Sequence, residues 1–178
     1  MEKEQILPSF TDLVELCEPS DPQISPDGSR IVYSRTSFDI MSDRSRSALW
    51  IVNSDGSDHR PPIAGPNNYS SARWSPDGTR MAYVSTEDGR AQIFLRWMDT
   101  GQETRLTNLT VSPGGISWSP DGQWIAFSMF VAHDDGTLSA DLPRKPEGAD
   151  WGPPIKVIDQ LSYRADGAGY LDEGYDHL

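Results

Sequence analysis

Cysteine, basic residues and long apolar runs are all scarce in this 178-residue sequence, and each scarcity excludes a class of protein. Cys17 is the only cysteine, so the chain can form no intramolecular disulfide and no zinc site built on two or four thiolates. The 15 Lys and Arg residues are outnumbered by 27 Asp and Glu, which gives a net charge of −12 and no basic stripe for phosphates. We therefore expect no nucleic-acid partner.

Signals for membrane insertion or export are also missing from the sequence. No apolar run approaches the roughly 18 residues of a membrane span. The N-terminus lacks the basic flank and apolar core of a signal peptide. These features predict a cytoplasmic protein with no membrane partner. A folded protein is expected, because 36% of the residues are hydrophobic and 10% are aromatic.

The tetrapeptide Ser-Pro-Asp-Gly occurs three times, at Ser25–Gly28, Ser75–Gly78 and Ser119–Gly122. An apolar residue precedes each serine, and a short apolar run follows each glycine. Proline, aspartate and glycine in this order favour a tight turn, so each copy predicts a strand, a turn and a second strand. The serines are 50 and 44 residues apart, a period typical of repeat architectures.

Each repeat is predicted to hold four strands. The third strands end at turns at Asp55–Gly56 and Asp99–Gly101, and both turns begin 20 residues before the next repeated serine. The extra residues of the first repeat must therefore lie earlier, in a surface loop around Thr36–Ser47. Fourth short strands are expected at His59–Ile63 and Glu103–Leu106. Four antiparallel strands in a repeat of this length are typical of a β-propeller blade.

We predict an all-β fold, a partial β-propeller of four-stranded antiparallel blades preceded by a short N-terminal helix. A capping box at Ser9–Asp12 predicts the start of this helix, and Pro19 its end. The expected divisions are an arm and helix at 1–20 and an incomplete propeller at 21–178, with blade 1 at about 21–65, blade 2 at about 70–108, blade 3 at about 114–162 with a long loop at 130–154, and the start of blade 4 at about 163–178.

Residues with catalytic or metal-binding chemistry do not form a recognised pattern. The nearest approach to the G-x-S-x-G nucleophile elbow, Gly115–Ser119, lacks the final glycine. His59, His133 and His177 are the only histidines, and we expect them on the surface. The run His133–Gly136 lacks the spacing of a calcium loop. We predict no catalytic residue, no metal site and no cofactor in this chain.

Two kinds of position alternate in the strand that leads into each Ser-Pro-Asp-Gly turn. Trp74 and Trp118 directly precede the repeated serine, and we predict that they pack between blades. Gln23, Arg73 and Ser117 lie one residue earlier and point to the other side of the strand. These three polar residues are the candidates for side chains that face a central channel.

Together these residues resemble the N-terminal β-propeller of prolyl oligopeptidase-family serine peptidases, in particular the acylaminoacyl-peptidase-like branch. The resemblance covers nearly the whole chain and depends on Asp21–Gly28, on the later copies of its turn, and on Pro146–Trp151 and Tyr163–Gly167. It implies that an α/β-hydrolase domain of the same polypeptide supplies Ser, Asp and His. The sequence is then expected to be a truncated propeller portion, with further blades and the hydrolase domain following Leu178.

The function that the resemblance implies is substrate gating. The propeller would admit peptide substrates to a serine peptidase that releases acylated residues or short peptides from oligopeptide N-termini. The alternative is a non-enzymatic propeller of the TolB type, a protein-binding module that carries the same Ser-Pro-Asp-Gly turn. A sialidase-like propeller fits less well, since only Ser119–Trp124 approaches an Asp-box.

Overall fold

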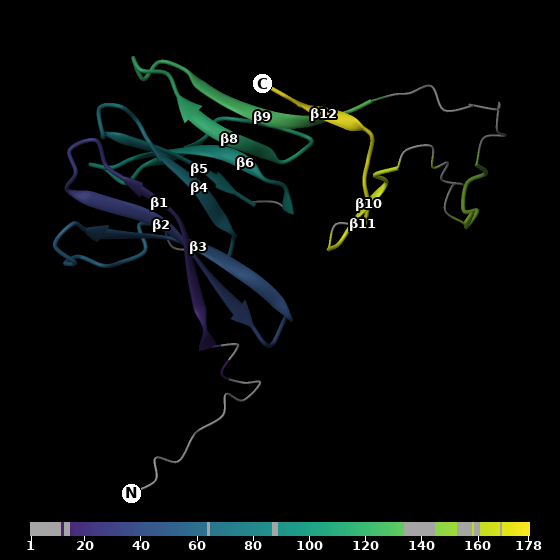
Figure 1. Ribbon diagram of the computed structural model, residues 1–178, viewed down its shortest axis with the longest axis horizontal. Coiled ribbons are helices and arrows are strands. Elements are labelled where there is room, and N and C mark those ends of the chain that lie inside the picture. The colour runs from purple at the N-terminus through teal and green to yellow at the C-terminus, as the bar shows by residue number, and fades with distance from the viewer. Residues whose placement is uncertain are drawn as a thin grey trace, which may run out of the picture. The chain divides into compact units, whose positions relative to one another are not determined.

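The computed structural model describes residues 12, 15–63, 65–86, 89–133, 145–152, 158, 161–167 and 169–178. The chain divides into two compact units, one formed by Met1–Met129 with Leu178 and the other by Phe130–His177. Strands dominate the described residues (Figure 1): β1 (Cys17–Ile24), β2 (Arg30–Asp39), β3 (Arg44–Asn53), β4 (Tyr69–Trp74), β5 (Arg80–Ser85), β6 (Gln92–Trp97), β7 (Glu103–Arg105), β8 (Pro113–Trp118), β9 (Ile125–Ala132), β10 (Arg164–Ala165), β11 (Gly169–Tyr170) and β12 (Gly174–His177).

The strands form successive antiparallel sheets, as the repeat predicts. Blade 1 has the order β1–β2–β3, blade 2 has the order β4–β5–β6–β7, and β8 pairs with β9 in blade 3. The fourth strand expected at Glu103–Leu106 is β7, whereas the one expected at His59–Ile63 is a single bridge between Ile51 and Arg60. The all-β blade architecture predicted from the sequence is confirmed.

Each Ser-Pro-Asp-Gly turn is closed by its own side chains. In the second turn the Ser75 hydroxyl donates to Asp77 Oδ1 (2.6 Å) and accepts from the Arg80 amide (2.9 Å), and the Gly78 amide donates to the Ser75 carbonyl (2.8 Å). Gly78 has a φ of 69°, a left-handed conformation that glycine adopts without strain. The same bonds recur in the first and third turns, which join β1 to β2 and β8 to β9.

The extra residues of the first repeat lengthen two strands instead of forming a loop. β2 and β3 have 10 residues each, whereas β5 and β6 have 6 each. The pairing of β2 with β3 continues without interruption from Arg30↔Asn53 to Asp39↔Arg44. The predicted loop at Thr36–Ser47 is therefore wrong over most of its length, because the inserted residues continue the antiparallel ladder and satisfy their backbone groups there.

The predicted N-terminal helix lies only partly inside the described residues, where Asp12 and Glu15 are helical. Its expected end at Pro19 is wrong, because Cys17 already begins β1 and Pro19 pairs with Arg35 of β2. The lengthened β2 supplies the pairing partner, and β1 is an edge strand, where a proline is tolerated.

The hydrophobic core of the first unit lies between blades. One cluster joins Val32, Leu49 and Ile51 of blade 1 to Tyr83 and other residues of blade 2. A second cluster joins blade 2 to blade 3; its buried members are Ala82, Val84, Ile93 and Ile116, with Trp118, Ile125 and Phe127 packed against them. Each blade thus stabilises its neighbour by burying one apolar face against it.

In the second unit, β10 and β11 pair as a hairpin, in agreement with the strand and turn predicted near Tyr163–Tyr170. β12 is hydrogen-bonded to β9, and the His133 amide donates to the Glu173 carbonyl (2.8 Å). The sequence division that places the start of a fourth blade at about 163–178 stays a prediction. Most of the loop expected at 130–154 lies outside the described residues.

Candidate functional site

Gln23, Arg73 and Ser117 occupy the same position in the first strands of three successive blades. The strand register shows this directly, because they pair with Val32, Ala82 and Ala126 in turn. The equivalence predicted from the repeat spacing therefore extends to the backbone hydrogen-bonding pattern.

A β-bulge precedes each of these three residues. The register shifts between Ser20 and Gln23, between Ser70 and Arg73, and between Gly114 and Ser117. Inside the bulges, Asp21, Ser71 and Gly115 have φ values of 48°, 55° and 57°. A bulge re-aims the side chain that follows it, so the repeated bulges direct the three candidates alike.

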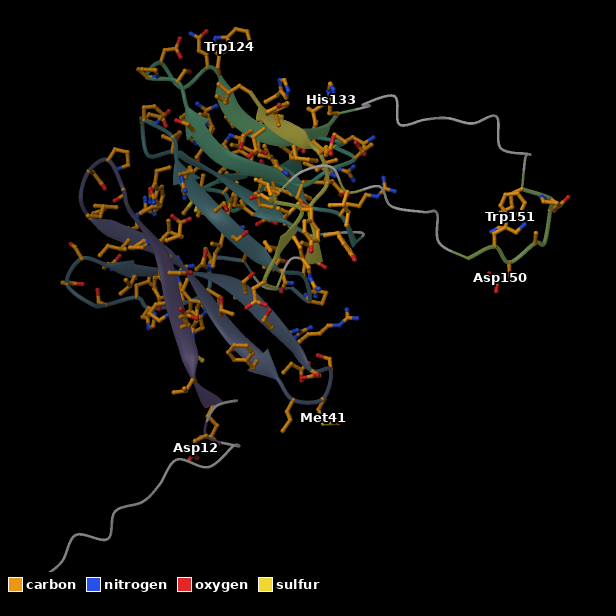
Figure 2. The ribbon with its side chains drawn as sticks, turned by 45° about the vertical axis from the view of Figure 1, so that its right-hand side comes forward. Asp12, Met41, Trp124, His133, Asp150 and Trp151 are labelled. Carbon is orange, nitrogen blue, oxygen red and sulfur yellow. The ribbon has the colours of Figure 1, made fainter. Side chains whose placement is uncertain are left out.

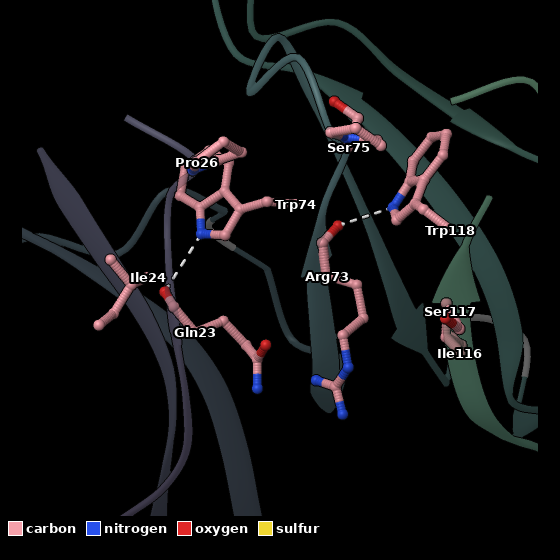
Figure 3. Close-up of a pocket in the computed structure, with 10 residues that line it drawn as sticks. Gln23, Ile24, Pro26, Arg73, Trp74, Ser75, Ile116, Ser117 and Trp118 are labelled. Atoms are coloured by element: carbon pink, nitrogen blue, oxygen red, sulfur yellow. Dashed lines mark hydrogen bonds between the residues drawn. The ribbon is translucent and has the colours of Figure 1, made fainter. Parts of the chain in front are cut away.

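The three candidates line one pocket of about 350 Å³ in the first unit. Figure 3 shows the side chains of Gln23 and Arg73 on neighbouring strands, with Ser117 on the next strand. Gln23 and Arg73 are half-buried and Ser117 is exposed. The remaining lining residues come from the same first strands and from the turns after them: Ile24, Pro26, Trp74, Ser75, Pro76, Ile116 and Trp118.

Asp21 organises the polar side of this pocket. Its Oδ1 accepts a hydrogen bond from Gln23 Nε2 (3.1 Å), and its Oδ2 accepts one from Arg73 Nη1 (2.7 Å). The ion pair is partly exposed, with 29% of the Arg73 side chain and 32% of the Asp21 side chain accessible to solvent. Asp21 thus links blades 1 and 2 and holds the guanidinium group at the pocket. The sequence analysis did not predict a role for Asp21. The feature that could have indicated this role is its position two residues before the candidate Gln23.

The tryptophans fix the spacing of the first strands. Trp74 Nε1 donates to the Gln23 carbonyl (3.2 Å), and Trp118 Nε1 donates to the Arg73 carbonyl (3.0 Å) (Figure 3). Both indoles belong to the interblade clusters, which confirms the packing role predicted for them. Gln23 and Arg73 therefore present their side chains to the pocket while their backbone carbonyls accept bonds from the next blade.

The chemistry available at the pocket is recognition. A guanidinium group, an amide and a hydroxyl lie beside two indoles, a set that suits the polar backbone and apolar side chains of a peptide. Among the described residues, no group of three or more His, Cys, Asp and Glu is placed to hold a metal ion. His59, His133 and His177 are exposed, as expected, and none of them lines the pocket. No helix in the described part of the chain is long and apolar enough to cross a membrane.

Comparison with known sequences relates the chain to a peptidase. It is 31% identical over 171 residues to the uncharacterized peptidase YuxL of Bacillus subtilis, which covers 94% of this chain and 25% of YuxL. A shorter match, 40% identical over 60 residues, connects 33% of the chain with 14% of the Tol-Pal system protein TolB of Alcanivorax borkumensis. No family model matches the sequence.

Solved structures agree on the fold. Acylaminoacyl peptidase of Pyrococcus horikoshii superposes with a TM-score of 0.66 at 17% identity, over 93% of this chain and 23% of that enzyme. The β-propeller domain of the Trilobed protease from Pyrococcus furiosus gives a TM-score of 0.52 at 17% identity, over 67% of this chain and 34% of that domain. The chain thus spans about a quarter of the length of YuxL and of the P. horikoshii enzyme.

Proposed function

We propose, from the premise that this chain belongs with the β-propeller segments of prolyl oligopeptidase-family peptidases, that it controls the entry of peptides to a catalytic domain. In this proposal an α/β-hydrolase domain of the same polypeptide supplies the nucleophile, and the substrates are short peptides or peptides with an acylated N-terminus. The propeller segment itself provides recognition and no catalytic residue.

The observation that carries the proposal is the shared pocket of Gln23, Arg73 and Ser117. Equivalent positions on the first strands of successive blades are arranged around one space, which is how residues along a propeller channel would be arranged. These side chains differ chemically, so the pocket can contact several groups of an extended peptide. Asp21 balances the charge of Arg73, which favours hydrogen bonding to a neutral peptide over attraction of any anion.

The TolB-like alternative remains a second candidate because part of the chain matches TolB. A protein-binding module would bind a folded partner, whereas a gating propeller would bind a short peptide and reject the same sequence in a folded protein. The YuxL match favours the peptidase, since it covers nearly the whole chain.

The test is a titration of the 178-residue chain with N-acetylated oligopeptides, followed by tryptophan fluorescence, because Trp74 and Trp118 line the pocket. Replacing Arg73 with alanine should weaken peptide binding about tenfold, the loss expected for one hydrogen bond to a charged group. Arg60→Ala is the matched control, since Arg60 also pairs with an aspartate, Asp58, but lies outside the pocket.

Equal affinities of the Arg73→Ala and Arg60→Ala variants would contradict a peptide site at this pocket. Preference for a folded protein over its own N-terminal peptide would support the TolB-like module instead. Turnover of acyl-amino-acid substrates that copurifies with the chain would contradict the assignment of catalysis to another domain.

We also propose that the protein is cytoplasmic, as predicted from the sequence. Cys17 is a free and exposed thiol. Exposed thiols persist in reducing compartments and oxidise elsewhere, which supports this setting.

A further inference from the structure

Arg73 uses only part of its hydrogen-bonding capacity in the pocket. Its guanidinium group has N–H donors on Nε, Nη1 and Nη2. Both N–H groups of Nη1 are engaged, since Nη1 donates to Asp21 Oδ2 and to the Ala72 carbonyl, each at 2.7 Å. Nε and Nη2 donate to none of the residues that the structure describes, and 29% of the side chain is open to solvent. The edge of the guanidinium group formed by Nε and Nη2 is therefore available to a ligand.

The polar side chains beside this edge add further donors. Gln23 Nε2 gives one hydrogen to Asp21 Oδ1 (3.1 Å), which leaves its second hydrogen without a partner among the described residues. The Ser117 hydroxyl group on the next strand is exposed and can donate or accept. Figure 3 shows the Gln23 amide and the Arg73 guanidinium group on the same side of their strands. Both oxygens of Asp21 are occupied by Gln23 and Arg73, so the pocket offers mainly hydrogen-bond donors.

An excess of donors discriminates among the polar groups of a peptide. A main-chain carbonyl group accepts hydrogen bonds and brings no charge, so it suits the free edge of Arg73. An ammonium group has only donors and would lie beside a cation, which disfavours it. A carboxylate fits the edge in shape, because two parallel N–H groups bind its two oxygens. The charge around Arg73 therefore decides between a carbonyl group and a carboxylate.

Asp21 supplies the opposing charge at this pocket. Among the described residues that line the pocket, Arg73 alone is charged, and Asp21 is its ion-pair partner. A ligand carboxylate on the free edge of Arg73 would lie across the guanidinium group from the Asp21 carboxylate. Repulsion by Asp21 would offset much of the attraction by Arg73. The net charge of −12 adds to this repulsion, so the surrounding charge favours the neutral carbonyl group.

We propose that the free edge of Arg73 binds main-chain carbonyl groups of an uncharged peptide segment and that Asp21 excludes carboxylates, which rests on the proposed function because the ligand is taken to be a peptide. The substrates are then peptides whose segment in the pocket has no acidic side chain and no free C-terminus. Asp21 acts through Arg73 and is a positioning residue, since it fixes the guanidinium group and offsets its charge.

Asp21→Asn removes the charge and can keep the geometry. The asparagine oxygen accepts from Arg73 Nη1, and its amide group donates to Gln23 Oε1 once the Gln23 amide turns over. Asp21 has a φ of 48°, a left-handed conformation that asparagine also tolerates. The test titrates the 178-residue chain with two short N-acetylated peptides of the same uncharged sequence, one ending in an amide and the other in a carboxylate. Tryptophan fluorescence reports binding, because Trp74 and Trp118 line the pocket.

The wild type should bind the amide peptide at least as tightly as the carboxylate peptide. Asp21→Asn should bind the carboxylate peptide about tenfold more tightly than the wild type does, the gain expected for one hydrogen bond between charged groups. The variant's affinity for the amide peptide should change by less than about threefold, because a neutral ligand does not sense the lost charge. Adding Arg73→Ala should abolish the gain, since the guanidinium group provides it.

Asp58→Asn is the matched control. Asp58 also has a left-handed φ, 49°, and pairs with an arginine, Arg60, but it lies outside the pocket. The substitution changes the net charge as Asp21→Asn does, so it separates local from overall charge. Met41→Ser controls for adhesion to exposed apolar side chains, since Met41 is 91% exposed in the turn between β2 and β3 (Figure 2). Both controls should bind the two peptides as the wild type does.

Near-ultraviolet circular dichroism checks that each variant folds. A folded Asp21→Asn variant that binds the amide peptide but gains no affinity for the carboxylate peptide would overturn the role of Asp21 and leave the proposed function in place. An equal gain in Asp58→Asn, or a gain that persists without Arg73, would overturn it as well. A wild type that prefers the carboxylate peptide would do so without any variant. If neither peptide binds the wild type, the proposed function and the role of Asp21 are both refuted.

Discussion

Replacing Ser75 with alanine removes the hydroxyl group that closes the second Ser-Pro-Asp-Gly turn. Ser75 is 0% exposed, and its Oγ is the acceptor for the Arg80 amide and the donor to Asp77. Alanine fills nearly the same space, so the substitution creates no cavity. The substitution is costly because the Arg80 amide loses the acceptor that the fully buried Ser75 hydroxyl group provides. A buried amide without a partner costs about 1–3 kcal/mol, so we expect a loss of about 2 kcal/mol.

The repeat provides a matched control for this loss. Ser119 makes the same two bonds, to Asp121 Oδ1 (2.5 Å) and from the Trp124 amide (2.9 Å), but it is only half-buried. Water can replace the hydroxyl group there, so Ser119→Ala should cost about 0.5–1 kcal/mol. The difference between the two variants measures the effect of burial on an otherwise identical turn.

Urea unfolding followed by tryptophan fluorescence gives both free energies, with all variants measured at one protein concentration. An unchanged slope of the free energy with urea would show that the native state keeps its compactness. A loss at Ser119 equal to or larger than the loss at Ser75 would refute the reasoning, because it would mean that burial does not set the cost.

Two further predictions concern acid stability and the pairing of β12 with β9. The hydrogen bond from Ser75, followed by the bond from the Thr79 amide, lowers the pKa of Asp77 to about 2. The stabilisation by this carboxylate is complete above its unfolded pKa near 4 and is lost as the pH falls from about 4 to about 2. The urea midpoint of the wild type should therefore fall with pH in this window, and Asp77→Asn should make the midpoint depend less on pH. An equal pH dependence of the midpoint in the variant and the wild type would contradict this. In the second unit, Gly174→Ala would place a Cβ against the backbone oxygen of Val131 and the ring of Phe130. The variant should lose the pairing of β12 with β9, seen as faster amide exchange at His133, and unchanged exchange there would contradict it.

The repeat arithmetic predicted the blades and their turns because the turn chemistry is local. The bonds of the Ser-Pro-Asp-Gly turn involve residues no more than five apart, so each copy specifies the same structure. The lengthened hairpin at Thr36–Ser47 was not predicted because most residues of that segment are polar. A polar segment is expected to form a surface loop unless its partner strand is known. Its extended form depends on cross-strand pairing from Arg35↔Ala48 to Asp39↔Arg44.

The pairing of β12 could not be predicted from the sequence. β12 pairs with β9 although more than forty residues separate them in the chain, and no local pattern indicates such pairing. The candidates Gln23, Arg73 and Ser117 could be named from the sequence because alternation along a strand is local, and their place at a channel stays a prediction. Asp21 was missed because its role depends on Arg73, which lies in the next blade and 52 residues away.

Gln23 and Arg73 each contribute a backbone carbonyl to the interblade bonds and a side chain to the pocket, and this separation would let the pocket vary within a fixed repeat. The carbonyl groups of Gln23 and Arg73 accept the indole bonds of the following blades, and any residue type supplies a carbonyl group. The side chains of the same residues line the pocket and lie outside the interblade hydrophobic clusters; the Arg73 guanidinium group is held there by its ion pair with Asp21. A change such as Arg73→Ala should therefore alter recognition while it leaves the bond to Trp118 in place. Substitutions at Trp74 or Trp118 should instead remove the interblade bond and thereby disturb the spacing of the strands on which every pocket side chain depends.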